Sequence, residues 1–422
     1  MRVACIHIPQ FALQAANRNN PALAGASVAL VPGGVNPVVV GLSKQAALAG
    51  VRLGVSAAAA RGLGVAVMVE DPIVERELVG ALADALLAVA STVELGGRTG
   101  PNDAHYAMYV RVPAKTRGLT FGGKVRALCA ELGVNVRVGI ADDRFTAWVA
   151  ACQLQPQRAN ARLEVADDGN VGCVPRGGAA AFLAPLPLSL LPISLEVQHM
   201  LAALGITTLG AFAALPEPTV ARSSQIGRFD AERDLLALAR GEGPAFVAPC
   251  ELRPVISERV AVSAEHSLVA AVRTLATRLA LALQGRGQVA SQLQLTVTGQ
   301  TSRSLDVALF PPLADADALA ERLGALLGGV EEVISLTVEV TGRSVVAADT
   351  LTAPSDPVAG AANDEMAANG VLRANGDGAD DLVDLPTLAL TPLAGFTRSG
   401  RRPLRRGKQR RRAVVSAQLL FA

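Results

Sequence analysis

The chain has 422 residues, of which 50% are hydrophobic and only 3% aromatic, and its formal net charge is +2. Its length exceeds that of one hydrophobic core, so we expect roughly two to four domains. Alanine and glycine supply much of the apolar fraction and no long uninterrupted apolar stretch occurs, which argues against a membrane protein.

The cysteines and histidines are scattered along the chain. This spacing disfavours a disulfide framework and a zinc site, so we expect no metal and no cofactor. The start, "MRVACIHIPQF", lacks the long apolar core of a secretion signal, and we therefore expect a cytoplasmic protein. The residues concerned are Cys5, Cys129, Cys152, Cys173, Cys250, His7, His105, His199 and His266.

The first 150 residues alternate between strand and helix patterns. Runs of β-branched residues predict strands, and apolar residues at helical spacing predict helices. Together they indicate a mixed α/β domain. The predicted strands span 3–8, 27–34, 36–43, 105–112 and 134–141, and the predicted helices span 43–51, 75–91, 121–133 and 144–154.

The pattern changes twice further along the chain. Prolines and two short helical segments, 194–206 and 208–216, mark a small helical region. From residue 253 the pattern reads strand, helix, two strands, helix and strand, which predicts a βαββαβ unit with both helices on one face of a sheet. Its predicted strands span 253–262, 291–299, 304–310 and 334–342, and its helices span 267–284 and 316–329.

The remainder has no periodicity. Eight acidic residues between Asp349 and Asp384 stand among Gly, Asn and Ala, which is typical of disorder. A basic run, "RSGRRPLRRGKQRRR", follows, and the chain ends on an apolar "QLLFA". We therefore divide the chain into an α/β domain (1–174), a helical domain (175–245), a βαββαβ domain (246–346) and a disordered tail (347–422).

The stretch "IHIPQFALQAANRNNPALAG" resembles the first motif of the Y-family (translesion) DNA polymerases. The segment "NNPALAGASVALV" matches their Asn-Pro-x-Leu-x-Gly-x-x-Val turn and strand. In this register the family's metal-binding aspartate lands on His7, its second acidic position on Pro9, and its aromatic steric gate on Ala12.

Other motifs of the family are matched with substitutions. "SKQAALAGVRLGV" resembles the segment that holds the triphosphate, with Lys44 in place of its tyrosine and Ala47 in place of its arginine. "VRVGIADDRFTAWVAA" resembles a strand–helix motif in which Trp148 replaces a triphosphate-binding lysine. The family's paired acids fall on Thr99 and Gly100.

The resemblance implies a fold of palm and fingers, a small helical thumb and a βαββαβ little finger. Two-metal nucleotidyl transfer needs carboxylates that bridge the ions, so the substitutions lead us to expect a chain that is not an enzyme. An active, divergent polymerase is the alternative and would have to use His7 with Asp103, Asp142 or Asp143. The adjacent Asp142 and Asp143 are otherwise interpreted as the N-terminal cap of a helix.

Y-family-like chains that lack these acids and carry a long tail form the ImuB-like group. Membership would imply a non-catalytic adaptor in DNA-damage-induced mutagenesis. Such an adaptor links an error-prone C-family polymerase and a RecA-like accessory protein to the sliding clamp on damaged or primed DNA, in the nucleoid. A stand-alone DNA-binding module is a further alternative.

The tail and the βαββαβ unit carry the expected binding residues. "QLLFA" is similar to the clamp-binding pentapeptide Gln-Leu-x-Leu-Phe, one residue short, with a simple apolar C-terminus as the alternative. The basic run could bind phosphates or an acidic partner, or be a solvated tail. The clamp-binding candidates are Gln418, Leu419, Leu420 and Phe421, and the DNA-binding candidates are Arg253, Arg259, Arg303, Arg343, Arg401, Arg402, Arg405, Arg406, Lys408, Arg410, Arg411 and Arg412.

Overall fold

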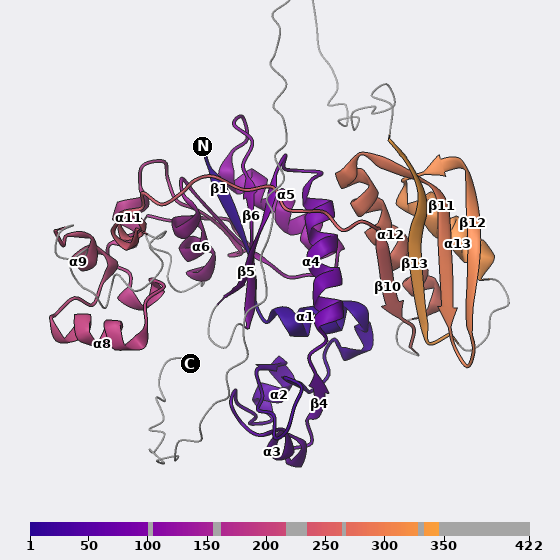
Figure 1. Cartoon of the computed structure of the whole chain (residues 1–422), viewed down its shortest axis with the longest axis horizontal. Helices are drawn as coiled ribbons and strands as arrows, with labels where there is room; N and C mark the ends of the chain where they lie inside the picture. The colour runs from indigo at the N-terminus through magenta and orange to yellow at the C-terminus, as the bar shows by residue number, and fades with distance from the viewer. Residues whose placement is uncertain (100–103, 155–161, 217–233, 264–266, 328–332, 346–422) are drawn as a thin grey trace, which may run out of the picture. The chain divides into compact units, whose positions relative to one another are not determined.

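The computed structural model describes residues 1–99, 104–154, 162–216, 234–263, 267–327 and 333–345. Residues 1–353 form one compact unit of the chain. The mixed α/β class expected from the sequence is confirmed, and Figure 1 shows the elements in chain order. The expected domain boundaries at residues 174, 245 and 346 stay predictions, and the tail from 347 to 422 lies outside the described residues.

A six-stranded sheet forms the centre of the N-terminal half, in the order β5-β6-β1-β7-β9-β8. β1 pairs antiparallel with both of its neighbours, and β7 pairs parallel with β9. Every residue of β1 is buried, including the polar His7, as in a strand covered on both faces. The strands are β1 (Val3–Ile8), β5 (Val93–Thr99), β6 (His105–Arg111), β7 (Arg137–Ala141), β8 (Glu164–Val165) and β9 (Val171–Cys173).

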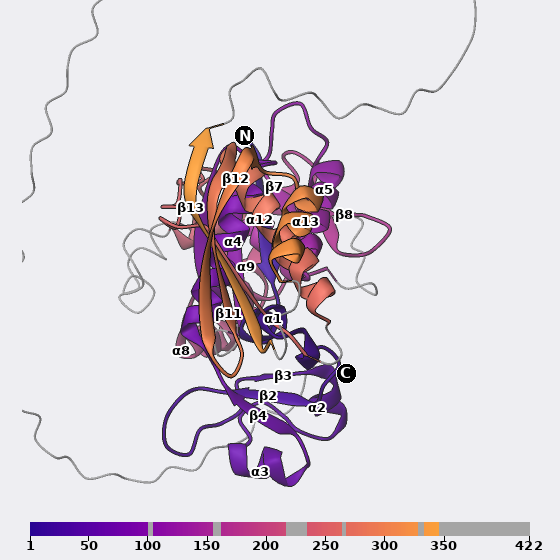
Figure 2. The same ribbon diagram turned by 90° about the vertical axis from the view of Figure 1, so that its right-hand side faces the viewer.

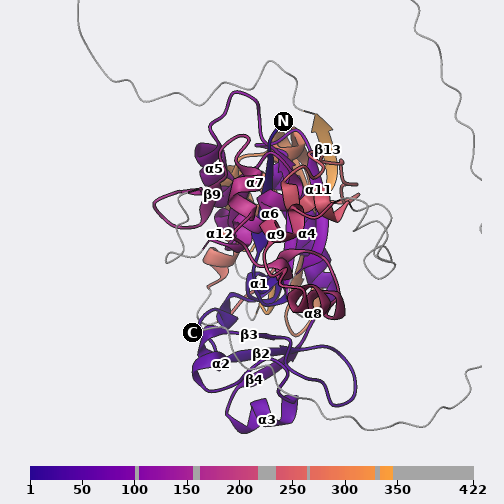
Figure 3. The same ribbon diagram turned by 90° about the vertical axis from the view of Figure 1, so that its left-hand side faces the viewer.

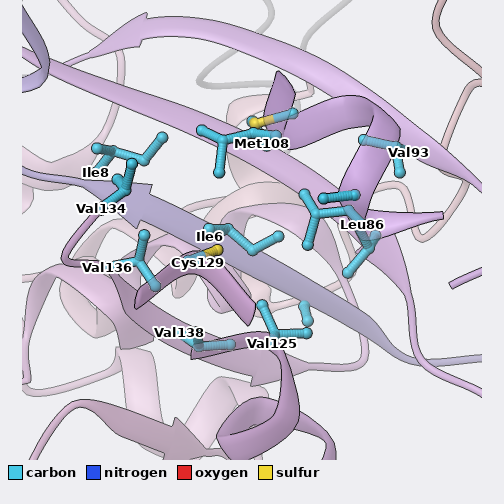
Figure 4. Packing of buried hydrophobic residues seen from close by; sticks show 14 of the residues in the cluster. Ile6, Ile8, Leu86, Val93, Met108, Val125, Cys129, Val134, Val136 and Val138 are labelled. Carbon is cyan, nitrogen blue, oxygen red and sulfur yellow. The ribbon is translucent and has the colours of Figure 1, made fainter. Parts of the chain in front are cut away.

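Two hydrophobic cores cover the two faces of this sheet. Side chains alternate along a strand, so Ile6 and Ile8 enter one core while Val3 and Cys5 enter the other. The first core, drawn in Figure 4, packs the sheet against α4 and α5. The second packs it against α6 and the short helices that follow. These helices are α4 (Pro72–Leu86), α5 (Gly118–Glu131), α6 (Arg144–Cys152), α7 (Ala179–Leu183), α8 (Leu195–Ala203), α9 (Leu209–Ala213) and α11 (Leu235–Arg240).

A small three-stranded sheet follows the first helix, α1 (Phe11–Asn19), and has its own core. Figure 3 shows this sheet with its two short helices. The strand expected over 36–43 is reduced to β3, because Pro37 has no N–H to donate and Val39 bonds to Val55 and not to a strand. The elements are β2 (Val28–Val31), β3 (Gly41–Leu42), β4 (Ala66–Val69), α2 (Lys44–Leu48) and α3 (Ala57–Gly62).

The predicted βαββαβ unit is confirmed as an antiparallel sheet in the order β10-β13-β11-β12. Figure 2 shows α12 and α13 on one face of this sheet, where they enclose a third core. By length and composition α12 could cross a membrane, but 56% of that segment is buried within the protein, as in a core helix. The elements are β10 (Ser257–Ala261), α12 (Leu268–Arg286), β11 (Gln288–Thr298), β12 (Ser302–Leu313), α13 (Ala316–Leu326) and β13 (Ser335–Val345).

Candidate functional site

The C-terminal end of β1 is the position at which the resemblance places a catalytic aspartate. His7 occupies it and is 3% exposed. Its ring centroid lies 5.0 Å from that of His105, the first residue of β6. Burial first, and then the neighbouring His105 and Arg137, lower the pKa of His7 to about 3. His7 is therefore a neutral imidazole at physiological pH, and its Nδ1 has no hydrogen-bond partner.

The turn from β1 to α1 is held by bonds to the neighbouring strands. Gln10 adopts a left-handed conformation, with φ of 48°, and its N–H donates to Nδ1 of His105 at 3.1 Å. The side chain of Gln14 donates to the carbonyl oxygen of Pro9 at 2.7 Å. These bonds hold the backbone around Pro9 and His7 in place. The turn is therefore well defined, although its side chains differ from those of the family's motif.

The resemblance implies Mg²⁺ at this position, and the donors present do not fit it. His7, His105 and Thr99 lie at the same end of the sheet, because Thr99 pairs with His105 and β1 lies on the other side of β6. Mg²⁺ takes oxygen ligands, mainly carboxylates, whereas imidazole suits softer metals. Within the described ranges, no three His, Cys, Asp or Glu side chains are grouped closely enough to hold a metal ion. Gly100 and Asp103 lie outside those ranges.

The other positions that the family's motifs assign to nucleotide binding lie on different helices. Lys44 and Ala47 are exposed on α2. Trp148 is half-buried on α6 and packs near Phe145, with 6.1 Å between the ring centroids. Ala12 is half-buried on α1 against the core around Leu13. These side chains thus come from three different helices, α1, α2 and α6.

The adjacent acids have structural roles, as expected. Asp143 caps α6, and its Oδ1 accepts from the N–H of Thr146 at 2.9 Å. Asp142 accepts from the N–H of Gly177 at 2.8 Å and pairs with Arg2 at 3.4 Å. Burial raises the pKa of Asp143. The interpretation as a helix cap is supported for Asp143, whereas Asp142 contacts Gly177 and Arg2.

The strand arginines of the βαββαβ unit do not gather on one face. Arg303 pairs in register with the buried Val297, so it lies on the helix side of the sheet, at the end of β12. Arg259 lies on the opposite side and pairs with Glu77 of α4 at 3.3 Å. Arg343 is exposed and donates to the carbonyl of Pro254 at 2.9 Å.

The open face of that sheet is polar and carries acids. Thr296 and Ser304 share a hydrogen bond of 2.8 Å there, and Gln294 donates to Asp306 at 3.0 Å. Glu339 lies beside Gln294 in the register. This face therefore offers hydroxyl and amide groups and not a concentrated positive charge.

Arg253 differs from the other DNA-binding candidates because each of its three guanidinium nitrogens donates to a group within the protein. Its Nε donates to Asp84 at 2.6 Å, its Nη1 to the carbonyl of Ser257 at 2.7 Å, and its Nη2 to Glu258 at 3.0 Å. Arg253 is thus paired with two buried acids, and its side chain is only 14% exposed, which makes it a poor candidate for a phosphate contact. The pairing with Asp84 was not foreseen from the sequence, because Asp84 is 169 residues away.

The comparisons with known proteins point to DNA polymerases over part of the chain. A protein named DNA polymerase IV from Dehalococcoides mccartyi is 30% identical over 176 residues, which is 41% of either chain. Another of that name from the same species is 40% identical over 92 residues, or 22% of this chain and 20% of the relative. The chain therefore spans about two fifths or less of the curated relatives it matches. No family model matches it.

The solved structures give a broad but distant likeness. The crystal structure of DinB from Sulfolobus solfataricus covers 81% of this chain and 98% of its own, at 16% identity and a TM-score of 0.43. A ternary complex of Dbh covers 82% of this chain and all of its own, at 15% identity and a TM-score of 0.45.

The expectation that the chain is not an enzyme is contradicted by these comparisons. The curated proteins similar to it in sequence are named DNA polymerase IV, which is the name of an enzyme. That expectation came from substitutions at single positions, and a poor fit of His7, Thr99 and their neighbours to Mg²⁺ does not establish inactivity. The replaced side chains at this end of the sheet describe one site and do not decide whether the protein is an enzyme.

Proposed function

We propose that the protein acts on primed or damaged DNA in translesion synthesis. The observation that carries this proposal is the sequence similarity over 176 residues to proteins named DNA polymerase IV. It is supported by the defined turn after α1, where Asn20 of the "NNPALAG" segment caps the short helix η1 (Pro21–Leu23). A cytoplasmic, nucleoid-associated location follows from this role.

The finer part of the proposal is an adaptor role. The protein would link an error-prone C-family polymerase and a RecA-like accessory protein to the sliding clamp, whether or not it synthesises DNA itself. Its support is the C-terminal "QLLFA", in which a glutamine, leucines and a phenylalanine supply the few anchors on which peptide affinity depends. The disorder predicted from composition for residues 347–422 would give such a peptide reach without constraining the folded unit.

The tail is also proposed as the principal DNA contact. The strand arginines are spread over different faces, or occupied as Arg253 is. The basic run from Arg401 to Arg412 is instead a dense sequence of eight cations. Each phosphate that such a run neutralises contributes about 0.9 to the slope of log K against log salt for duplex DNA.

Fluorescence anisotropy with a labelled primed duplex tests this contact. The full chain is compared with a variant in which the eight basic residues of 401–412 are replaced by glutamine, over a series of salt concentrations. We expect weaker binding and a shallower salt dependence for the variant. Equal affinity and equal slope would show that the DNA contact lies in the folded unit.

Primer extension with Mg²⁺ and with Mn²⁺ measures whether the chain itself performs synthesis. Incorporation that is lost in Asp103→Ala would place that acid at the reacting centre. Extension by a C-family polymerase, measured with and without the chain and the clamp, tests the adaptor role independently. Stimulation that requires the last six residues supports it, and no stimulation contradicts it.

A further inference from the structure

A pocket of about 430 Å³ lies at the start of β1, at the end of the strand opposite His7. Three arginines line it, Arg2, Arg111 and Arg176, together with the apolar wall Val112–Ala114 and the hydroxyl-bearing Thr116. No carboxylate is among the described residues that line it. The six residues of β1 place it roughly 20 Å from the His7 end at about 3.3 Å per residue, so it is separate from the site described above.

Arg2 is fixed as the floor of this pocket. Its Nη1 donates to Sγ of Cys173 at 3.2 Å, its Nη2 to the carbonyl of Val174, and its Nε faces Asp142 at 3.4 Å. Asp142 therefore compensates the charge of Arg2. Gly118 makes room for this arrangement, because a Cβ at that position would lie 2.6 Å from Sγ of Cys173.

The other two arginines are uncompensated. Arg111 ends β6 and Arg176 follows β9, and both are exposed. Neither side chain has a hydrogen-bond or ion-pair partner within the part of the chain that the structure describes. Two positive charges are thus presented to the same pocket without an acid to neutralise them.

The backbone that carries both arginines is held in place. Val112, next to Arg111, donates its N–H to the carbonyl of Arg2 at 3.1 Å. On either side of Arg176, Val174 donates to Ile140 at 2.8 Å and Gly177 donates to Asp142 at 2.8 Å. Arg111 at the end of β6 and Arg176 in the turn after β9 therefore both extend from backbone that is hydrogen-bonded to the sheet.

We propose that this pocket binds a terminal phosphate group. A phosphate carries close to two negative charges at neutral pH, which matches Arg111 and Arg176, and a guanidinium can contact it with two parallel hydrogen bonds. The volume lies within the range of roughly 300–1,000 Å³ that is usual for small-ligand sites. The apolar wall of Val112 and Pro113 suits the body of a nucleotide, and the 5′-phosphate of a DNA strand offers the same group.

Isothermal titration calorimetry of the full chain at low salt tests this proposal. The probes are ADP, inorganic pyrophosphate and adenosine, and a short single strand with or without a 5′-phosphate. We expect phosphate-bearing probes to bind and their affinity to fall at least about tenfold for each of Arg111→Ala and Arg176→Ala. Adenosine should not bind, and any binding of the 5′-hydroxyl strand through the basic run should be the same in Arg111→Ala and Arg176→Ala as in the unaltered chain.

The matched controls each remove one exposed arginine elsewhere, Arg273→Ala or Arg322→Ala, and so change the net charge by the same amount as each pocket variant. Each control should retain the affinity of the unaltered chain, and unchanged thermal unfolding should show that every variant is folded. If the affinity for ADP falls in the Arg111 and Arg176 variants, the ligand is a small molecule. If only the affinity for the phosphorylated strand falls, the ligand is a DNA end. The proposal is overturned if no phosphate probe binds, if the pocket variants bind as the unaltered chain does, or if the controls lose the same affinity.

Discussion

Arg253, in the segment before β10, donates through its Nε to Oδ2 of Asp84 on α4 at 2.6 Å. Asp84 is fully buried and also accepts from Arg286 of α12. Arg253 continues the chain of charges to Glu258 of β10, which pairs in turn with Arg18 of α1. A buried ionic network thus connects the βαββαβ unit to the helices that cover the six-stranded sheet.

The first prediction concerns Asp84. Asp84→Ala leaves Arg253 and Arg286 buried without their partner, and removal of one member of a buried pair costs about 3–5 kcal/mol. Urea unfolding should show a loss of that size. The control is Glu77→Ala, which removes a half-exposed partner of Arg259 and should cost about 0–1 kcal/mol. Equal losses would mean that the buried network does not stabilise the fold.

The second prediction uses two helical glycines. A Cβ on Gly285 of α12 would lie 1.8 Å from the carbonyl oxygen of Asp84, whereas a Cβ on Gly324 of α13 would meet nothing within 4 Å. We expect Gly285→Ala to destabilise the protein by more than about 1–3 kcal/mol, since helix backbones must move apart. Gly324→Ala should stabilise it by about 0.4–1 kcal/mol. Thermal unfolding of both variants checks this, and a neutral Gly285→Ala would rule out the close crossing of α12 and α4.

The third prediction concerns pH. The folded state holds His7 with a pKa of about 3, whereas an unfolded chain has an ordinary value near 6.5. Between these pH values the unfolded state binds more protons than the folded state. A fall in pH therefore favours unfolding. The free energy of unfolding therefore keeps the full contribution of His7 above pH 6.5. This contribution falls by up to about 1.4 kcal/mol per pH unit between pH 6.5 and about 3.

Chemical unfolding at several pH values between 4 and 8 measures this slope. His7→Gln should flatten it, and His199→Gln, which removes an exposed imidazole on α8, is the control. If His7→Gln keeps the slope of the unaltered chain, another group is responsible. His105 is the next candidate, because burial and then Arg137 also lower its pKa.

The fourth prediction separates capping from chemistry at Asp143. Asp143→Ala removes the acceptor for the N–H of Thr146 and should cost about 0.5–2 kcal/mol. Asp143→Asn keeps an equally good cap and removes a charge whose burial is unfavourable, so it should retain stability. Any primer-extension activity should be the same in Asp143→Asn as in the unaltered chain. A selective loss of activity in Asp143→Asn would contradict the purely structural role.

Local patterns predicted much of the fold, because strands and helices differ in the period of their apolar residues. β1 and the βαββαβ unit are recognisable on that ground alone, and the cap at Asp143 needs only its immediate neighbours. Contacts between distant residues were not predictable in this way. Neither the His7–His105 pair nor the burial of Arg253 against Asp84 leaves a local signal, and β4 (Ala66–Val69) is too short to stand out.

The identity of the site illustrates the same limit. His7 lies on β1, Pro9 in the turn and Ala12 on α1, whereas the family roles that the motif register assigns to these positions stay predictions. The register did not show whether side chains from other elements complete the site. The inference from missing acids to a non-enzyme was wrong in the light of the relatives named DNA polymerase IV, since it treated single positions as decisive.

The most direct test of the proposed function is clamp binding on primed DNA. The full chain and a variant lacking residues 417–422 are mixed with a sliding clamp loaded on a primed template, and the retained protein is measured after a wash at moderate salt. We predict that the full chain is retained by the clamp and that the truncated chain is not. Equal retention of both, or no dependence on the clamp, would contradict the account.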